Sequence, residues 1–228
     1  MKIDNVQVYG LNESIVASGF PMNEEHSANV FADEVHEVDR HIDFVLGNFN
    51  VDEQLAEFEN NKHIKRSISL ASCKGGESHD CFLCGIVVQF NMTAPRYFFP
   101  EFARYHFADI ISSTSTMHKL KSVVKKYAKA DEIERVDIIS QHFSPLTGLS
   151  IAEAFMEFAV DNIDSLEEIK ANLPEGWLQT ARITTNYRQL KTIKNQRKDH
   201  RLNEWKDFCA WIETLPLAQQ LLCVNGRG

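Results

Sequence analysis

Apolar residues recur at helical spacing in several parts of the chain. The clearest case is residues 27–46, where a valine, isoleucine or phenylalanine returns every three or four positions, and this pattern predicts an amphipathic helix. Similar though shorter patterns predict helices at 51–59, 101–107, 118–130, 151–161, 165–172, 186–198 and 202–214. Helices are therefore the main predicted element.

Strand patterns are fewer and lie between the predicted helices. Residues 82–92 are nearly all apolar and rich in β-branched side chains, which predicts a central, buried strand. Looser alternation predicts strands at 3–11, 63–71 and 182–185. Because strands and helices do not alternate regularly, we expect an α+β fold with a mixed or antiparallel sheet packed with helices. The chain has 228 residues and no internal repeat or long linker, which predicts a single domain over residues 1–228.

Composition narrows the classes of function. The formal net charge of -8 repels nucleic acid and anionic membranes, and no stretch is apolar for long enough to span a membrane. The N-terminus lacks the apolar segment of a signal peptide. Five cysteines, an odd number, do not form the disulfide framework of a secreted protein. We therefore expect a cytoplasmic protein without membrane partners.

Positive charge is concentrated in one segment. Between residues 182 and 201 only Asp199 opposes a run of cations: Arg182, Arg188, Lys191, Lys194, Arg197, Lys198 and Arg201. One interpretation is a local anion site for a small phosphorylated ligand. The other is a solvated helix face, which is the better interpretation of a charge run taken alone.

Two blocks of residues stand out by their order and spacing. In the first, Arg104-Tyr105-His106 follows the predicted buried strand, and Thr114 comes after seven more residues. In the second, Leu173-Pro174 is followed by eleven residues and then by Asn186-Tyr187-Arg188-Gln189-Leu190, with Arg197 farther along the same predicted helix.

With these blocks the chain resembles the flavin-dependent thymidylate synthases, and the resemblance extends over roughly its whole length. The family has an Arg-His-Arg motif with a serine after seven more residues, and a Leu-Pro followed by Asn-x-Arg-x-Leu. The resemblance implies an FAD-dependent enzyme that moves a one-carbon unit from methylenetetrahydrofolate to C5 of a deoxyuridylate-like nucleotide. NADPH would reduce the flavin. It also implies a homotetramer with active sites built across subunits.

The resemblance carries site residues over to this chain. For the flavin it implies contacts from Arg104, His106, Asn186, Arg188 and Thr192. For the nucleotide it implies contacts from Glu101, Arg104, Thr114, Lys170 and Arg197. Arg197 is also the expected catalytic residue. These types suit such ligands, because arginine binds phosphate through two parallel hydrogen bonds and the start of a helix favours anions. Each arginine, taken alone, also fits an ordinary surface ion pair.

Several family positions carry other residues here. Tyr105 stands in place of the motif's central histidine, and Glu101 in place of a glutamine. Thr116 replaces an arginine, and Gly85 replaces a flavin-contacting histidine. The phosphate site therefore loses a cation and gains an acid. These changes leave open a catalytically inactive descendant of the fold that acts in binding or assembly.

Two further constellations suggest other functions. Zinc would accept the ligand types found in one cluster, which consists of Cys73, His79, Cys81 and Cys84. A structural zinc site usually has two paired motifs, and only Cys81 and Cys84 resemble one. We therefore expect ordinary cysteines that bind no metal.

The lysines of segment 119–129, together with the basic segment 182–201, suggest a nucleic-acid surface. The negative net charge and the lack of a DNA-binding motif count against a nucleic-acid partner.

Overall fold

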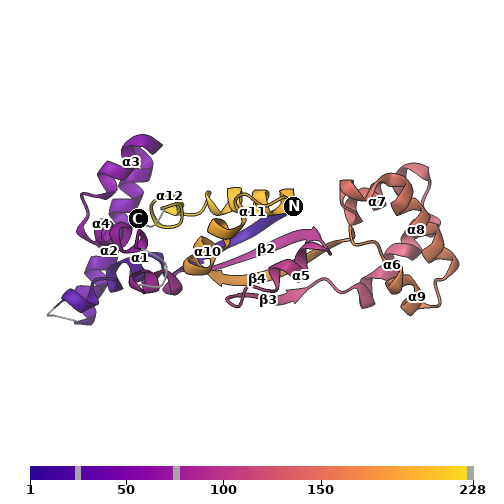
Figure 1. Cartoon of the computed structure of the whole chain (residues 1–228), viewed down its shortest axis with the longest axis horizontal. Coiled ribbons are helices and arrows are strands. Elements are labelled where there is room, and N and C mark those ends of the chain that lie inside the picture. Colours follow the sequence, from indigo (N-terminus) through magenta and orange to yellow (C-terminus); the bar gives the residue numbers. More distant parts are fainter. Residues whose placement is uncertain (24–26, 74–77, 225–228) are drawn as a thin grey trace. The chain divides into compact units, whose positions relative to one another are not determined.

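The computed structural model describes residues 1–23, 27–73 and 78–224. Four strands form an antiparallel sheet in the order β1-β2-β4-β3 (Figure 1). They are β1 (Lys2–Tyr9), β2 (Val87–Pro95), β3 (Ala108–Ser113) and β4 (Leu178–Asn186). The predicted α+β class is confirmed.

Helices make up most of the remaining structure. The first half of the chain contains α1 (Leu11–Ala17), η1 (Phe20–Met22), α2 (Ala28–Asn48), α3 (Val51–Phe58), α4 (Lys62–Ala71), η2 (His79–Gly85) and α5 (Phe98–Phe102). The second half contains α6 (Thr116–Lys129), α7 (Glu132–His142), η3 (Pro145–Thr147), α8 (Leu149–Asp161), α9 (Leu166–Ala171), α10 (Tyr187–Arg197), α11 (Asn203–Ile212) and α12 (Ala218–Leu221). Within the described ranges, no helix combines the length and the apolar character that crossing a membrane requires.

The chain divides into two compact units. Unit 1 contains Met1–Val6 and Phe90–Thr184, and unit 2 contains Gln7–Gln89 and Thr185–Gly228. Each unit is therefore built from segments that are distant in the sequence. The single domain over residues 1–228 stays a prediction.

Strand β2 and the second half of β4 alternate between a buried and a half-buried face, whereas β1 and β3 are mostly exposed or half-buried. In β2, Phe90 and Met92 are fully buried, whereas Asn91 and Thr93 between them are half-buried and polar. Strand β2 is thus less apolar on one face than the sequence predicted, and it begins at Val87. The first part of the predicted strand, residues 82–85, belongs to the 3₁₀ helix η2 instead.

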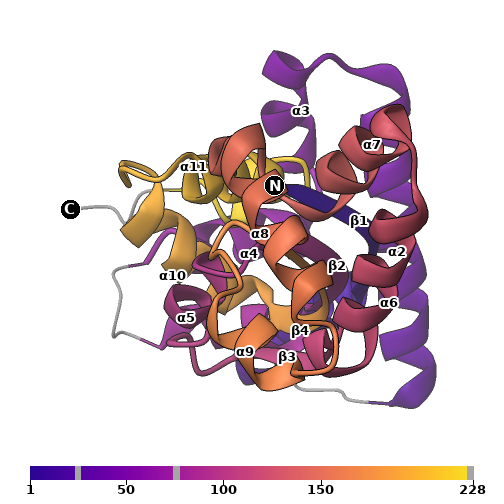
Figure 2. The same ribbon diagram turned by 90° about the vertical axis from the view of Figure 1, so that its right-hand side faces the viewer.

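In unit 1, helices α6 to α9 surround an aromatic core (Figure 2). The ring of Phe143 lies edge-on to Trp177, with 5.1 Å between centroids, and 6.0 Å from the ring of Phe155. Such edge-to-face pairs stabilise a core beyond the apolar area they bury.

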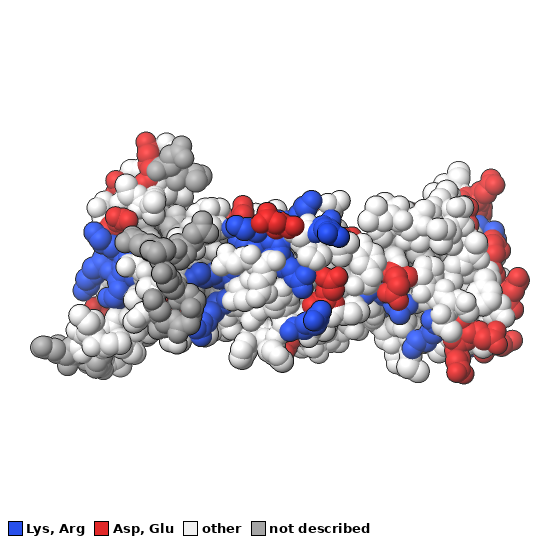
Figure 3. All heavy atoms as spheres, in the orientation of Figure 1, with Lys and Arg blue, Asp and Glu red and all other residues white. Residues whose placement is uncertain are grey.

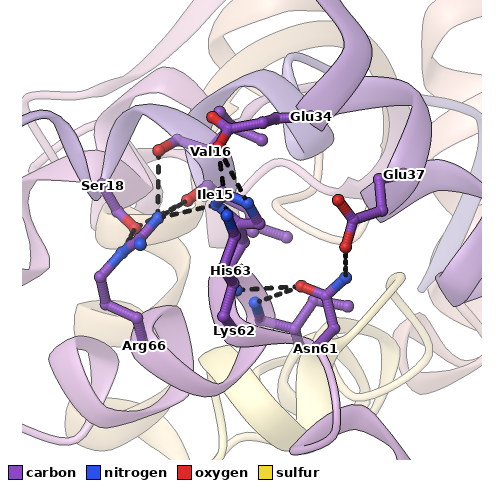
Figure 4. Close-up of polar contacts among 10 residues, drawn as sticks. Ile15, Val16, Ser18, Glu34, Glu37, Asn61, Lys62, His63 and Arg66 are labelled. Carbon is purple, nitrogen blue, oxygen red and sulfur yellow. Dashed lines mark hydrogen bonds and ion pairs between the residues drawn. The ribbon is translucent and has the colours of Figure 1, made fainter. Parts of the chain in front are cut away.

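In unit 2, a buried polar cluster joins α1, α2 and α4 (Figure 4). Arg66 of α4 donates from Nη2 to the carbonyl oxygen of Val16, at 3.1 Å, and to that of Ile15, at 3.3 Å. The same nitrogen lies 3.2 Å from Nδ1 of His63, whose Nε2 is 3.5 Å from Glu34 of α2. Arg66 therefore satisfies carbonyls at the end of α1 that the helix itself leaves unpaired.

Most strongly periodic helices are confirmed, namely those predicted at 27–46, 51–59, 118–130, 151–161, 165–172, 186–198 and 202–214. The strand predicted at 63–71 is wrong, because this segment is helix α4. Its buried positions, His63, Ile64, Ser67 and Ala71, follow helical spacing, and Asn61 caps its start by accepting from the amides of His63 and Ile64.

Two other predicted boundaries differ from the structure. The helix predicted at 101–107 is the short α5, which ends at Phe102 because it buries only Phe98 and Phe102, one turn apart. The strand predicted at 182–185 extends over the whole of β4. Elements that the sequence did not predict are α1, η1, η2, β3, α7, η3 and α12.

Candidate functional site

Unit 1 contains a polar cavity of about 160 Å³ beside the end of β3. Its wall consists of Thr93, Thr114, Ser115, Thr116, Lys119, Val123, Gln141, His142, Trp177, Leu178 and Thr180. Small-molecule sites usually measure about 300–1,000 Å³, so this cavity has room for part of a ligand. Hydroxyl groups, a lysine and a histidine give it the donors that a phosphate or a sugar needs.

Thr114 is held firmly in this wall by β4. Its amide donates to the carbonyl oxygen of Thr180 at 2.8 Å, and its hydroxyl oxygen accepts from the amide of Thr180 at 3.1 Å. Gln179 donates to the Thr114 carbonyl at 3.2 Å. Because the Thr114 hydroxyl accepts from the protein, its own proton is available to donate to a ligand.

The electrostatics of the cavity favour an anion. Helix α6 begins at this wall with no acidic residue in its first turn, and the hydroxyl of its cap residue, Ser115, makes no capping hydrogen bond. The positive end of the α6 dipole and the Lys119 ammonium therefore add to each other. Burial lowers the pKa of His142, and Lys126 and Lys119 lower it further, against a backbone hydrogen bond that raises it. His142 is thus held in its neutral form near pH 7.

Of the residues that the resemblance assigned to the nucleotide, only Thr114 lines this cavity. Among the described residues, Glu101, Arg104, His106 and Lys170 are not part of its wall. Glu101 is half-buried in α5, and Arg104 and His106 are exposed in the segment after it. Lys170 is exposed in the last turn of α9.

The other assigned residues lie along α10 in unit 2. The Asn186 side chain caps this helix by accepting from the amide of Gln189 at 2.9 Å. The Thr192 hydroxyl donates to the carbonyl oxygen of Arg188, one turn earlier, at 3.0 Å. Both side chains therefore have a structural role in the helix.

Arg188 is paired with an acidic residue. Its Nε lies 3.1 Å from Oδ1 of Asp80 in η2, and Oδ2 of Asp80 is 3.5 Å from Nζ of the buried Lys191. Burial lowers the pKa of Arg188, but Asp80 and the nearby Cys81 and Cys84 outweigh it and raise that pKa overall. The Arg188 side chain has 35% of its surface exposed.

The basic segment 182–201 makes more internal contacts than its sequence suggested. Arg182 donates to the carbonyl oxygen of Asn5 at 2.8 Å, and Lys194 lies 3.1 Å from Glu213. Arg197 stacks on the buried ring of Trp205, with its Cζ 4.6 Å from the ring centroid. The interpretation of this run as a solvated helix face is therefore wrong for these cations.

Gly85 has a local structural reason. A Cβ atom added at this residue would lie 2.5 Å from Oγ of Ser14 in α1. At this position, where the family that the chain resembles carries a flavin-contacting histidine, a side chain would thus require the Ser14 hydroxyl to move.

The cysteine-histidine constellation does not assemble into a metal centre. Among the described residues, no three side chains from histidine, cysteine, aspartate or glutamate gather as a metal site. Cys81 and Cys84 are exposed free thiols, and Cys73 is a half-buried one.

Sequence reasoning missed several residues of the cavity, including Lys119, His142 and Trp177. His142 ends α7, a helix that was not predicted, so nothing placed it near Thr114. The available signal was the run of serines and threonines at 112–116, which leads from β3 into α6 and supplies three of the wall residues.

The fold matches that of known nucleotide-binding enzymes, although no protein-family model and no curated protein matches the sequence. A flavin-dependent thymidylate synthase ThyX from Helicobacter pylori, complexed with FAD and dUMP, superposes with a TM-score of 0.64. The match covers 99% of this chain and 100% of that one at 14% identity. The fold that the resemblance implied is therefore confirmed.

Two further structures agree. A second Helicobacter pylori ThyX structure, with FAD and dUMP, covers 69% of this chain and 81% of its own at 17% identity, with a TM-score of 0.56. A UMP/dUMP methylase, PolB from Streptomyces cacaoi, bound with 5-Br dUMP, covers 99% and 96% at 12% identity, also with a TM-score of 0.56. The chain thus has a nucleotide-methylase-like fold.

Proposed function

We propose that this chain binds FAD and methylates C5 of a pyrimidine nucleoside monophosphate. The observation that carries the proposal is the fold, shared over 99% of the chain with a ThyX structure that contains FAD and dUMP. The cavity beside Thr114 supports it, because it offers hydroxyl donors and a lysine where the resemblance assigns a nucleotide contact.

In this proposal the nucleotide contacts the residues that the resemblance assigns to it. The Thr114 hydroxyl donates to a phosphate or sugar oxygen, and Arg104 and Lys170 add positive charge. Glu101, which stands in place of a glutamine, accepts a hydrogen bond from the ligand. Arg197 is the proposed catalytic residue and also contacts the nucleotide.

The flavin uses the start of α10. Arg188 is partly exposed in the first turn of this helix, where its guanidinium suits a pyrophosphate. Asn186, Thr192, Arg104 and His106 complete the proposed flavin contacts. The bound flavin supplies the hydride, methylenetetrahydrofolate the one-carbon unit, and NADPH the reducing equivalents.

We also propose that the protein is a cytoplasmic homotetramer. In the related family, active sites are built across subunits, so residues from separate copies would complete one site. Assembly is therefore part of the functional proposal.

The first test measures flavin binding. The protein is incubated with FAD and desalted, and its visible absorption spectrum is recorded. We expect a retained flavin spectrum, and we expect Arg188→Gln to weaken FAD binding about tenfold or more, since a charge-assisted hydrogen bond contributes about 1.5–3 kcal/mol. Lys198→Gln is the matched control, because it removes an exposed cation just after α10.

The second test measures the reaction. Methylation at C5 replaces the hydrogen there, so tritium at C5 of deoxyuridylate should be released when FAD, NADPH and methylenetetrahydrofolate are all present. Arg197→Met should abolish the release. A folded protein that retains no flavin, or that retains flavin but releases no tritium from dUMP or UMP, would contradict the proposed activity.

A second candidate function is that of a non-enzymatic descendant that uses this fold for binding or assembly. Three observations favour it: Asp80 pairs with Arg188, Arg197 stacks on Trp205, and the Ser14 hydroxyl occupies the space beside Gly85. Turnover of a pyrimidine nucleotide in the tritium assay would exclude it.

A nucleic-acid-associated protein is the third candidate, and the structure offers it less support. Arg182, Arg188, Lys194 and Arg197 are engaged in contacts within the chain, and acidic side chains gather over α8 and α9 of unit 1 (Figure 3). Salt-sensitive binding to DNA would be needed to support it.

A further inference from the structure

Two cysteines share one face of the short helix η2. Cys81 and Cys84 are three residues apart in this 3₁₀ helix, and both are exposed free thiols. A 3₁₀ helix has three residues per turn and rises about 2.0 Å per residue, so positions i and i+3 eclipse each other about 6 Å apart. A disulfide joins Cα atoms about 4.4–6.8 Å apart, so the Cα spacing of a 3₁₀ helix falls within the range that a disulfide spans, and the Cβ atoms would have to approach to about 3.5–4.5 Å as the bond forms.

A cation lies against this pair. The Arg188 side chain lies close enough to Cys84 and Cys81 for both cysteines to contribute to the rise in its pKa. Asp80, next to Cys81 in the chain, holds Arg188 in place through the 3.1 Å contact to its Nε. The buried Lys191 contacts the other Asp80 oxygen at 3.5 Å. Helix η2, which carries both thiols, therefore packs against the start of α10, which carries the cation.

Cys73 and Cys209 differ from this pair, and burial is the largest influence on the Cys223 thiol and raises its pKa, although Lys194 lies beside it. Cys73 is half-buried and its thiol donates to the carbonyl oxygen of Ser69 at 3.6 Å. Burial raises the pKa of the Cys209 thiol to about 11, so Cys209 is a poor nucleophile near neutral pH. The pair also lacks the further ligands that a metal ion would need within the described residues.

We propose that Cys81 and Cys84 form a thiol–disulfide exchange site whose oxidant is a low-molecular-weight disulfide. The Cys84 thiolate attacks one sulfur of that disulfide, forming a mixed disulfide and releasing one thiolate. The Cys81 thiolate then attacks Sγ of Cys84 and releases the second. Both cysteine protons end on the released thiols, and the protein gives up two electrons as one Cys81–Cys84 bond forms.

Closure of this bond changes the surroundings of Arg188. The Cys84 sulfur becomes a disulfide sulfur, so Arg188 loses its thiol neighbour and keeps the Asp80 carboxylate. The site therefore links the redox state of η2 to the start of α10. The exchange itself needs only residues of unit 2 and does not rest on the proposed flavin chemistry.

The test uses the full chain and glutathione disulfide as the oxidant. After incubation, free thiols are counted and the peptide that contains both cysteines is analysed by mass spectrometry. We expect wild type to lose two thiols and this peptide to lose two hydrogens. Cys81→Ser should stop at a glutathione adduct on Cys84, and Arg188→Gln should slow closure about 3- to 10-fold.

Cys73→Ser is the matched control, because it removes a nearby thiol outside the pair and should leave closure unchanged. Far-UV circular dichroism verifies that each variant is folded. Separate glutathione adducts on both cysteines of wild type, or reaction at Cys73 as fast as at Cys84, would overturn the proposal. So would binding of one zinc ion that protects both thiols from exchange.

Discussion

Gly10 is the residue that most needs to be a glycine in the described part of unit 2. It precedes α1 with φ +71°, in the left-handed region, and a Cβ atom there would lie 2.7 Å from the carbonyl oxygen of Gly85. Both its conformation and the close approach of another backbone segment therefore exclude a side chain.

We predict that Gly10→Ala lowers the free energy of unfolding by about 2 kcal/mol or more, because the left-handed conformation alone costs about 1–2 kcal/mol for other residues. Gly47→Ala is the control. Gly47 lies within α2, and a Cβ atom added there would have no neighbour within 4 Å, so the change should stabilise by about 0.5–1 kcal/mol. Urea unfolding measures both. Equal effects of the same sign would contradict this account.

Individual site residues were predictable by type but not by environment. The sequence contains Arg188 and Arg197, but it does not show that Arg188 pairs with Asp80 or that Arg197 stacks on Trp205. Such contacts depend on how η2 and α11 pack against α10, which is a tertiary property. Thr114 was predicted from its spacing to the motif, and it lines the cavity, but its role as a nucleotide contact stays a prediction.

At the scale of elements, helix prediction succeeded where the apolar stripe is unambiguous, as in α2. It failed at α4, where His63 and Ser67 are buried on the same face as Ile64, so polar residues interrupt the hydrophobic pattern. It also failed at α7, whose Ile133 and Val136 are exposed and blur the stripe. The sequence of a segment shows which of its residues are apolar. Which residues are buried depends on the elements that pack against the segment, and these cannot be read from the segment alone.

The cluster that joins α1, α2 and α4 should make stability depend on pH. An arginine has only donors, so His63 Nδ1 accepts from Arg66 and the ring proton lies on Nε2, toward Glu34. Burial lowers the pKa of His63 most, the charges of Arg66 and Lys62 lower it further, and Glu34 and Glu37 partly oppose them. The folded-state pKa therefore lies below the ordinary value of 6.5.

Below pH 6.5 the unfolded chain accordingly takes up a proton that the folded chain does not. We predict that stability is fully present above that pH and falls as the pH decreases, by up to about 1.4 kcal/mol per pH unit from this residue. His142, whose pKa is also lowered, contributes in the same direction. Urea unfolding at about pH 7.5 and pH 5.5 measures the difference.

His63→Gln should make this pH dependence shallower, even if it lowers stability at every pH. Glu34→Gln is the informative companion, since it removes the carboxylate that raises the His63 pKa, and the fall in stability should then extend to lower pH. Parallel pH profiles for wild type and His63→Gln would show that the cluster does not titrate on unfolding.

At the scale of the whole molecule, the fold is more conserved than the residues. Matches at 12–17% identity cover the chain from end to end in two of the three structures compared. The order of two motif blocks was enough to predict this fold, because spacing along the chain reflects element lengths and connections. The division into two units was not predicted, since each unit combines segments that are far apart in the sequence.

The proposed oligomer gives a prediction for the edge strand β3. Strand β3 ends the sheet order, and its Ile110 and Ile111 are 39% and 54% exposed, with Phe107 just before it 65% exposed. An exposed apolar edge strand offers unpaired backbone groups, which soluble proteins usually cover or protect with charge. We therefore expect a second copy to cover this edge.

We predict that Ile111→Lys shifts the protein from its assembled form toward smaller species, because the new charge would have to be buried in the contact. Size-exclusion chromatography with light scattering measures the mass at several concentrations. Ile151→Lys is the control, since Ile151 is 58% exposed but lies on helix α8. A wild-type chain that remains a monomer at high concentration would remove the proposed tetramer. An assembly equally sensitive to both changes would place its contact away from β3.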